Sequence, residues 1–337
     1  MFDFLVYIGR FQPFHNGHKT VIDAALKQAK RVIVLIGSDK QPRSLRNPFT
    51  FVERADIIYD CYDETDRIQC LPIQDHPYND TAWIAEVQTM VKTGTWERSI
   101  GDTKIGLIGH SKDNSSYYLK LFPQWGSVNV PQKHLYSATD IRREYFTSTP
   151  RLPLNTAPDA TIDFMRSFIE NSAFNSLVKE QEYITKYKKS WENSPYPPTF
   201  VTADSVVTQA GHVLVIERKA SPGKGLYAMP GGFLDQSETL EQCAIRELHE
   251  ETKLKVDVGV LRSSITMVRT FDGPNRSERG RIITTAFRFD LPEARELPKV
   301  KGGSDAGRAF WMPISQLNSE LFFEDHYAII KTMLELN

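Results

Sequence analysis

The sequence has few cysteines and lacks any long apolar run. Its three cysteines, Cys61, Cys70 and Cys243, are odd in number and widely separated. This spacing excludes a disulfide framework and a Cys-x-x-Cys metal site, and it indicates a reducing compartment. No stretch approaches the roughly 20 apolar residues of a membrane span, and the apolar residues 1–8 are too short for a signal peptide. We therefore expect a soluble cytoplasmic protein without a membrane partner.

Net charge is nearly absent as well, at −1 from 41 basic and 42 acidic residues. The molecule as a whole has no electric field to hold it on nucleic acid, so no nucleic-acid partner is expected. A ligand that carries phosphates must then be attracted locally, by helix N-termini, individual basic side chains or metal ions. The composition leaves the oligomeric state, including a homo-oligomer, open.

The first part of the chain alternates short apolar runs with helical patterns. We expect buried strands at residues 4–9, 31–37, 67–73 and 104–110. Apolar residues at helical spacing separate the first two strands and recur after the second one. This repetition predicts an α/β domain with a parallel, Rossmann-like sheet covered by helices on both faces. Ligands of such sheets bind at the carboxyl ends of the strands.

The rest of the 337 residues predicts a second domain of α+β type. Residues 160–191 have a helical pattern, and SPYPPT at 194–199 suits a stiff, extended linker. We therefore place the boundary after residue 192, which gives domains 1–192 and 193–337. The second domain should contain a hairpin over 199–218, a helix over 238–252, strands at 265–271 and 281–289, and a closing helix near 322–335.

The segment GRFQPFHNGH, residues 9–18, lies where the first strand gives way to the first helix. Gly9 and Gly17 permit a tight turn or a close approach of a ligand. His15 and His18 are three residues apart, so both imidazoles face the same way if the turn is helical. Together with the helix N-terminus they would form a cradle for a polyphosphate. The alternative is a capped helix start with two surface histidines, and this segment alone fits both.

A second motif, SATDIRR at residues 137–143, precedes another helical run. Ser137 and Thr139 can cap that helix or bind phosphate, and Arg142 can donate to phosphate oxygens. The two motifs together resemble those of the HxGH nucleotidyltransferases, GxFxPxHxGH early and SxTxxR late. The NPFT segment at 47–50, followed by Glu53 and Arg54, is similar to that of archaeal-type nicotinamide mononucleotide (NMN) adenylyltransferases.

This resemblance covers about residues 1–170 and implies that NMN attacks the α-phosphorus of ATP to give NAD and pyrophosphate. Mg²⁺ would enter with ATP. Another phosphate monoester, nicotinate mononucleotide or phosphopantetheine, is the alternative acceptor. The resemblance implies that His15 and His18 hold the phosphates, that Thr139 and Arg142 bind the leaving pyrophosphate, and that Trp83 stacks on the nicotinamide ring, although Trp83 also suits a core position. The implied nucleotide-binding set is completed by Gly9, Arg10, Phe11, Gly17, Arg54 and Ser137.

A third motif occupies residues 232–254, GFLDQSETLEQCAIRELHEETKL. Glu247, Glu250 and Glu251 are at i, i+3 and i+4, so their carboxylates share one face of a helix. Grouped carboxylate oxygens are the ligands that Mg²⁺ or Mn²⁺ requires. The alternative is an acidic helix face in solvent, which the spacing from Gly232 to Arg246 makes the weaker interpretation.

The third motif resembles the Nudix box, GX5EX7REUXEEXGU, over a region of about residues 198–337, with Lys253 in place of the last glycine. The resemblance implies metal-dependent hydrolysis of a nucleoside diphosphate linked to another group. Glu247, Glu250 and Glu251 would bind the metal, with Glu250 and Glu251 counted as catalytic. The fusion to an NAD-forming domain suggests ADP-ribose as substrate, with AMP and ribose 5-phosphate as products. The alternative is a non-catalytic nucleotide sensor.

Overall fold

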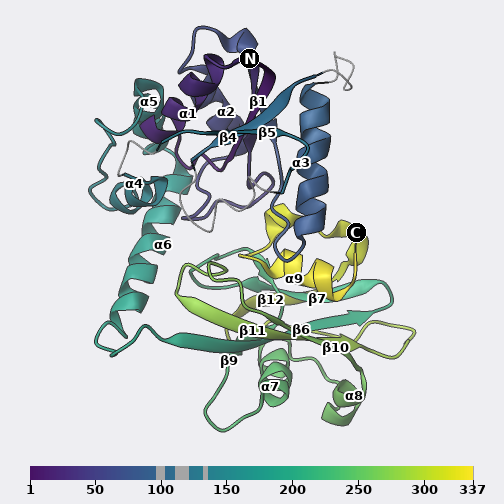
Figure 1. Cartoon of the computed structure of the whole chain (residues 1–337). Coiled ribbons are helices and arrows are strands. Elements are labelled where there is room, and N and C mark those ends of the chain that lie inside the picture. Colours follow the sequence, from purple (N-terminus) through teal and green to yellow (C-terminus); the bar gives the residue numbers. More distant parts are fainter. Residues whose placement is uncertain (96–102, 111–120, 132–135, 337) are drawn as a thin grey trace. The chain divides into compact units, whose positions relative to one another are not determined.

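The computed structural model describes residues 1–95, 103–110, 121–131 and 136–336 (Figure 1). The chain divides into two units, Met1–Gln181 and Glu182–Asn337. The division falls within a helix, and the boundary that we expect after residue 192 lies a little further along the chain. No helix among the described residues is long and apolar enough to cross a membrane.

Five parallel strands form the sheet of the first unit, in the order β3-β2-β1-β4-β5. The central strand β1 is buried on both faces, because Leu5 and Val6 on its opposite sides have no exposed surface. The order reverses beside β1, which makes the carboxyl end of β1 the expected ligand site of such a sheet. The strands are β1 Phe2–Gly9, β2 Ala29–Ile36, β3 Ile68–Pro72, β4 Ile105–Gly109 and β5 Gly126–Asn129.

Helices cover both faces of this sheet, as the alternating pattern predicts. α1 (Asn16–Leu26) and α2 (Phe51–Tyr59) pack their apolar residues against one face. α3 (Asp80–Gly94) packs against the other face through residues that include Val87 and Val91. A short 3₁₀ turn, Thr65–Arg67, precedes β3. The predicted Rossmann-like α/β fold is confirmed.

Three further helices follow the sheet: α4 (Ala138–Tyr145), α5 (Asp159–Phe168) and α6 (Ser172–Lys189). The helical pattern expected over residues 160–191 is confirmed, and the structure divides it into the two helices α5 and α6. The chain turns after α5, and the Asn171 side chain accepts a hydrogen bond from the Ala173 N–H (2.9 Å) at the start of α6. An asparagine that bonds the backbone two residues ahead favours such a break over a continuous helix.

A mixed sheet of seven strands forms the second unit, with the main order β10-β11-β6-β7-β12. β6 and β11 run parallel over ten paired positions, while β8 and β9 pair with β7 and β6. The expected α+β architecture is confirmed, and β12 is a strand that the apolar pattern does not reveal. The strands are β6 Thr199–Gln209, β7 His212–Arg218, β8 Tyr227–Ala228, β9 Gly231–Phe233, β10 Ile265–Phe271, β11 Arg281–Asp290 and β12 Ala306–Pro313.

The helix α7 (Leu240–Thr252) carries the third motif and packs on this sheet. Cys243, Ala244 and Leu248 on its apolar side are fully buried against residues of β6 and β11. Glu251 is buried on this side of α7 as well and accepts a hydrogen bond from the Gly231 N–H of β9, so its carboxylate does not face open solvent. The remaining helices are α8 Val258–Ser263 and α9 His326–Met333, with 3₁₀ turns at Ile314–Gln316 and Ser319–Leu321.

Candidate functional site

His15 and His18 close the N-terminus of α1 at the carboxyl end of β1. His15 Nδ1 accepts a hydrogen bond from the Gly17 N–H (3.0 Å), and His18 Nδ1 accepts one from the His15 N–H (3.3 Å). The two rings stack with their centroids 3.8 Å apart. Because each Nδ1 accepts, each neutral imidazole carries its proton on Nε2, which is the donor that a phosphate oxygen requires. The histidines thus cap the helix, as the alternative interpretation expects, but His15 is 7% exposed and is not a surface residue.

Phe11 fixes the loop that leads to these histidines. Its ring packs edge-on against His18 with centroids 4.9 Å apart, and its backbone has a φ of 53°. A Cβ on Gly9 would lie 2.8 Å from Phe11 Cζ, which is too close for any other residue. Gly9 is thus required by the ring of Phe11, while Gly17 lies buried in the first turn of α1.

Arg142 joins the late motif to the early one. Its Nη1 donates to the Gln12 carbonyl (2.7 Å), its Nε to the Leu45 carbonyl (2.8 Å) and its Nη2 to Thr139 Oγ1 (3.2 Å). Only 8% of Arg142 is exposed. The structure therefore brings Arg142 and Thr139 to the loop that precedes the histidines, and the contact of Arg142 with pyrophosphate stays a prediction.

Ser137 begins α4 as its N-cap. Its Oγ accepts a hydrogen bond from the Asp140 N–H (3.2 Å), and the Asp140 carboxylate accepts from the Ser137 backbone N–H (3.2 Å) in return. The same carboxylate also accepts a hydrogen bond from the Ser137 hydroxyl (2.7 Å). Ser137 thus shapes the helix start that presents Thr139 and Arg142, and a direct contact with nucleotide stays a prediction.

Arg54 lies behind the candidate pocket. It is 1% exposed, and Nη1 donates to the carbonyls of Gly37 (2.6 Å) and Arg10 (2.7 Å). These carbonyls follow β2 and β1, so Arg54 ties together the loops at the carboxyl ends of two adjacent strands. A charge that is buried this deeply is retained where its donors are satisfied. Arg54 thus holds these two loops together, and its expected place in the ligand-binding set stays a prediction.

Gln12 is a site residue that the motifs do not single out. Its side-chain amide pairs with both backbone groups of Phe49, at 2.8 Å and 3.0 Å. These bonds hold the NPFT segment against the GRFQPF loop. The signal in the sequence is weak, because glutamine in a loop is ordinarily exposed, whereas Gln12 is 1% exposed.

Trp83 packs at the edge of the apolar cluster between α3 and the sheet. It lies on α3, partly buried, with its ring centroid 6.0 Å from that of Phe122. This contact agrees with the core interpretation, and stacking on a nicotinamide ring stays a prediction.

In the second unit, Arg246 organises the carboxylates of α7. It forms two hydrogen bonds with Glu238 (2.6 and 2.9 Å) and one with Glu247 Oε1 (2.7 Å). The hydrogen bonds from Arg246 lower the pKa of Glu238 to about 2. Glu250 is further away, with its Oε2 3.6 Å from Arg246 Nη1, and its side chain is 47% exposed. Arg246 thus orients Glu247.

Glu251 reaches from α7 to the adjacent strand β9. Its Oε2 accepts a hydrogen bond from the Gly231 N–H (3.0 Å), and only 5% of the residue is exposed. Burial, together with the nearby charges of Glu247 and Asp204, raises the pKa of Glu251 to about 8. Burial also raises the pKa of Glu247. Gly232 is required beside them, because a Cβ there would lie 2.3 Å from Glu247 Oε1.

The donor set of α7 fits a hard divalent cation. Among the described residues no three carboxylate, histidine or cysteine side chains converge closely enough to hold a metal as they stand, since Glu247 turns to Arg246 and Glu251 to Gly231. Yet two adjacent carboxylates with raised pKa values are groups whose charge a cation would stabilise. We therefore judge that Glu247, Glu250 and Glu251 fit such a metal by their chemistry.

Lys253 ends α7 in the left-handed conformation, with φ 50° and ψ 26°. The backbone geometry of the motif's glycine is thus kept without the glycine. An L-residue pays roughly 1–2 kcal/mol in this region. The carboxylates one turn earlier keep their helical positions.

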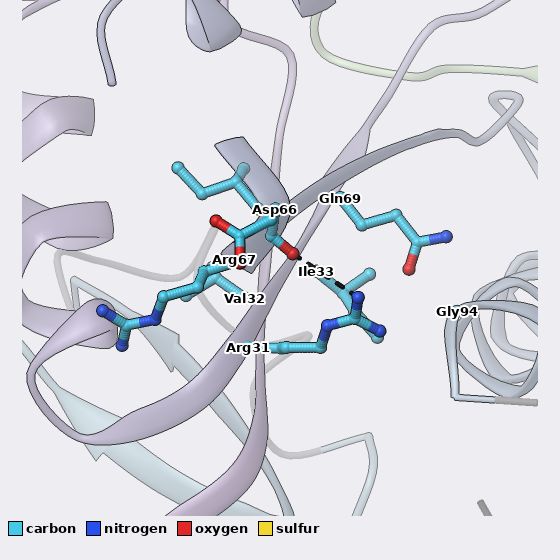
Figure 2. A pocket seen from close by; sticks show the side chains of 8 residues that line it. Arg31, Val32, Ile33, Asp66, Arg67, Gln69 and Gly94 are labelled. Atoms are coloured by element: carbon cyan, nitrogen blue, oxygen red, sulfur yellow. Dashed lines mark hydrogen bonds between the residues drawn. The ribbon is translucent and has the colours of Figure 1, made fainter. Parts of the chain in front are cut away.

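A separate hollow of about 260 Å³ lies at the amino ends of β2 and β3, away from the motif loops (Figure 2). Figure 2 shows the Arg31 guanidinium turned to the Asp66 carbonyl. Arg67 likewise donates to the carbonyls of Leu26 and Ala29. Because these guanidinium groups already donate to backbone carbonyls, the hollow gives no support for a second phosphate site.

Comparison with known proteins agrees with both motif sets. Residues 6–144 match the cytidylyltransferase-like family, and residues 198–333 match the NUDIX domain. The nicotinamide/nicotinic acid mononucleotide adenylyltransferase of Acinetobacter baylyi is 40% identical over 185 residues, covering 54% of this chain and 94% of that protein. The ADP-ribose pyrophosphatase of Methanocaldococcus jannaschii is 32% identical over 131 residues, covering 39% and 70%.

The solved structures that resemble the whole chain include that of a bifunctional NMN adenylyltransferase/ADP ribose pyrophosphatase from Francisella tularensis complexed with AMP and Mn ion. It is 33% identical, covers 99% of each chain and has a TM-score of 0.91. Because the likeness extends over both units and both motif sets, the chain belongs to the family of bifunctional NMN adenylyltransferase/ADP-ribose pyrophosphatase proteins.

Proposed function

We propose that the chain is a bifunctional enzyme of NAD metabolism. The first unit would join ATP and NMN into NAD and pyrophosphate, and the second would hydrolyse ADP-ribose to AMP and ribose 5-phosphate. The observation that carries the proposal is the likeness to the Francisella tularensis structure across the whole chain, together with a paired-histidine cap in one unit and grouped carboxylates in the other.

In the first unit the reaction needs positioning and charge stabilisation rather than a covalent intermediate. His15 and His18, each protonated on Nε2, would donate to phosphate oxygens whose charge grows in the transition state. The α1 N-terminus adds its positive dipole end. Arg142 and Gln12 would keep the loops in place, since both bond backbone groups there, and Thr139 would meet the leaving pyrophosphate.

In the second unit, Glu247, Glu250 and Glu251 would hold Mg²⁺ or Mn²⁺, which supplies an activated water at neutral pH. Arg246 would keep Glu247 oriented, and the Gly231 N–H would do the same for Glu251. A raised pKa means that Glu251 would release its proton as the cation binds. We also propose Mg²⁺ as the physiological cation and the cytoplasm as the location.

The acceptor of the first reaction has one supported alternative. The name of the Acinetobacter baylyi relative includes nicotinic acid mononucleotide beside the nicotinamide compound. Rates with ATP and each acceptor, measured separately and in competition, would decide which one this chain prefers.

The proposal is tested by product analysis of the purified chain. ATP with NMN should give NAD and pyrophosphate, and ADP-ribose should give AMP only when Mg²⁺ or Mn²⁺ is present. Absence of NAD with every acceptor would overturn the first assignment. Binding of ADP-ribose without hydrolysis at any metal concentration would replace the second assignment by a nucleotide sensor.

A further inference from the structure

An aromatic row in the second unit begins before the residues that match the NUDIX domain. Trp191 lies outside the matched range 198–333, and its ring centroid is 6.2 Å from that of Phe200 on β6. The Phe200 ring in turn lies edge-on to Phe233, with centroids 5.8 Å apart. Phe233 ends the row with 38% of its surface exposed. The row thus supports an exposed ring on the strand that precedes α7.

Arg279 stands beside that exposed ring. Its guanidinium carbon is 5.9 Å from the Phe233 ring centroid. Its Nε donates to Ser277 Oγ (3.2 Å), its Nη2 forms an ion pair with Glu324 Oε2 (3.6 Å), and its guanidinium carbon also lies 5.8 Å from the Phe323 ring centroid. The next residue, Gly280, has a φ of 151° that side chains rarely adopt, and it packs near Trp191 and Phe200. The loop is thus bent to bring a cation to the end of the aromatic row.

Phe233 lies on β9 two residues after Gly231, whose N–H bonds Glu251. A Cβ on Gly232 would point at Glu247, whereas one on Gly231 would point at Asp204, so Phe233 shares the side of Gly231. Burial raises the pKa of Asp204 on this side, and the charge of Arg279 lowers it by a smaller amount. Glu251 reaches the same strand at the Gly231 N–H. Phe233 is therefore about 7 Å along the strand from the residue that anchors Glu251, a span that one ribose bridges between base and phosphate.

We propose that Phe233 and Arg279 bind the nucleotide half of the substrate in the second unit. The purine base stacks on the exposed face of Phe233, and Arg279 donates to the adjoining phosphate. Trp191 acts as a positioning residue that supports this ring from outside the matched domain. The inference rests on the proposed ADP-ribose hydrolysis and adds the residues that recognise its adenosine end.

The test compares the full-length chain with its Phe233→Ala, Phe233→Leu and Phe233→Tyr variants. Base–aromatic stacking is worth about 1–3 kcal/mol by alanine substitution, so kcat/KM for ADP-ribose should fall about 5- to 150-fold in Phe233→Ala, chiefly through KM. Leucine should restore little and tyrosine most of the rate. Tyr196→Ala is the control for loss of an aromatic side chain, because Tyr196 lies in the 194–199 linker and is 83% exposed. This variant should leave kcat/KM for ADP-ribose unchanged.

Product inhibition separates base recognition from general damage to the site. Phe233→Ala should weaken inhibition by AMP about tenfold or more and leave inhibition by ribose 5-phosphate unchanged. Arg279→Gln should weaken inhibition by AMP, and Arg279→Lys should restore part of it. The proposal would be overturned if Phe233→Ala weakened inhibition by AMP and by ribose 5-phosphate equally, or if that variant had wild-type kinetics.

Tryptophan fluorescence decides the matter without turnover. AMP should change the emission of the wild-type chain, and the part of that change due to Trp191 should vanish in Trp191→Phe. The difference between the two proteins removes any signal from AMP bound in the first unit. If the wild type hydrolyses no ADP-ribose, the proposed function fails. A Trp191 signal would then still support a base site, and its absence would overturn that site as well.

Discussion

Glu251→Gln should make the metal-free protein more stable while it abolishes the response to metal. Glu251 is 5% exposed, and burial raises the pKa of its carboxyl from 4.5 to about 8. One pKa unit corresponds to about 1.4 kcal/mol. Holding this carboxylate charged without a cation therefore costs on the order of 5 kcal/mol above pH 8. Glutamine keeps the acceptor for the Gly231 N–H and removes the charge.

The effect should depend on pH in one direction. The folded-state pKa of Glu251 lies above its unfolded-state pKa. The wild type therefore has its full stability below about pH 4.5, where the carboxyl is protonated, and loses stability as pH rises to about 8. The gap between Glu251→Gln and wild type should thus be small at pH 4.5 and widest near pH 8. Near pH 8, allowing for the cost of a buried amide, we expect the free energy of unfolding of metal-free Glu251→Gln to exceed that of the wild type by about 2–4 kcal/mol. This corresponds to a Tm increase on the order of 5–15 °C.

Thermal unfolding in EDTA and in Mn²⁺, at several pH values, measures both effects. Mn²⁺ should raise the Tm of the wild type, because a ligand of the folded state stabilises it by mass action, and should do so far less for the variant. Glu250→Gln is the control: its side chain is 47% exposed, so its metal-free stability should change by less than about 0.5 kcal/mol. A variant that is less stable than wild type in EDTA, with no dependence on pH, would refute the argument.

Three further predictions concern separate features. His18→Ala should lower NAD synthesis about 10²- to 10³-fold through loss of one phosphate donor, while hydrolysis of ADP-ribose persists; a near-normal rate of NAD synthesis would contradict the phosphate role. Lys253→Gly should stabilise the protein by about 1 kcal/mol, because glycine adopts φ 50° without strain, and a lower Tm would show that the lysine side chain matters more than its backbone. A fragment of residues 1–192 should fold and synthesise NAD, since few contacts are expected to cross a proline-bearing linker; an insoluble or inactive fragment would show that the proposed boundary is misplaced.

Local patterns in the sequence were sufficient for the fold class of each domain and for the placement of the motifs. Apolar runs of four to eight residues predicted four of the five parallel strands, because a strand buried on both faces must be apolar throughout. The spacing of Glu247, Glu250 and Glu251 placed them on one helix face, because helical geometry follows from residue number alone. Lys253, at the position of the last glycine of the motif, adopts the left-handed conformation that glycine favours.

Burial and long-range partners were decided only by the tertiary structure. Arg54 has the residue type of a phosphate ligand, yet it bonds the carbonyls of Arg10 and Gly37, which are distant in sequence and meet only when β1 and β2 pair. Glu250 and Glu251 are adjacent, yet one side chain is about half exposed and the other residue is buried. Sequence spacing sets the direction of a side chain, but its burial, and hence its pKa, depends on which strand or loop packs against it.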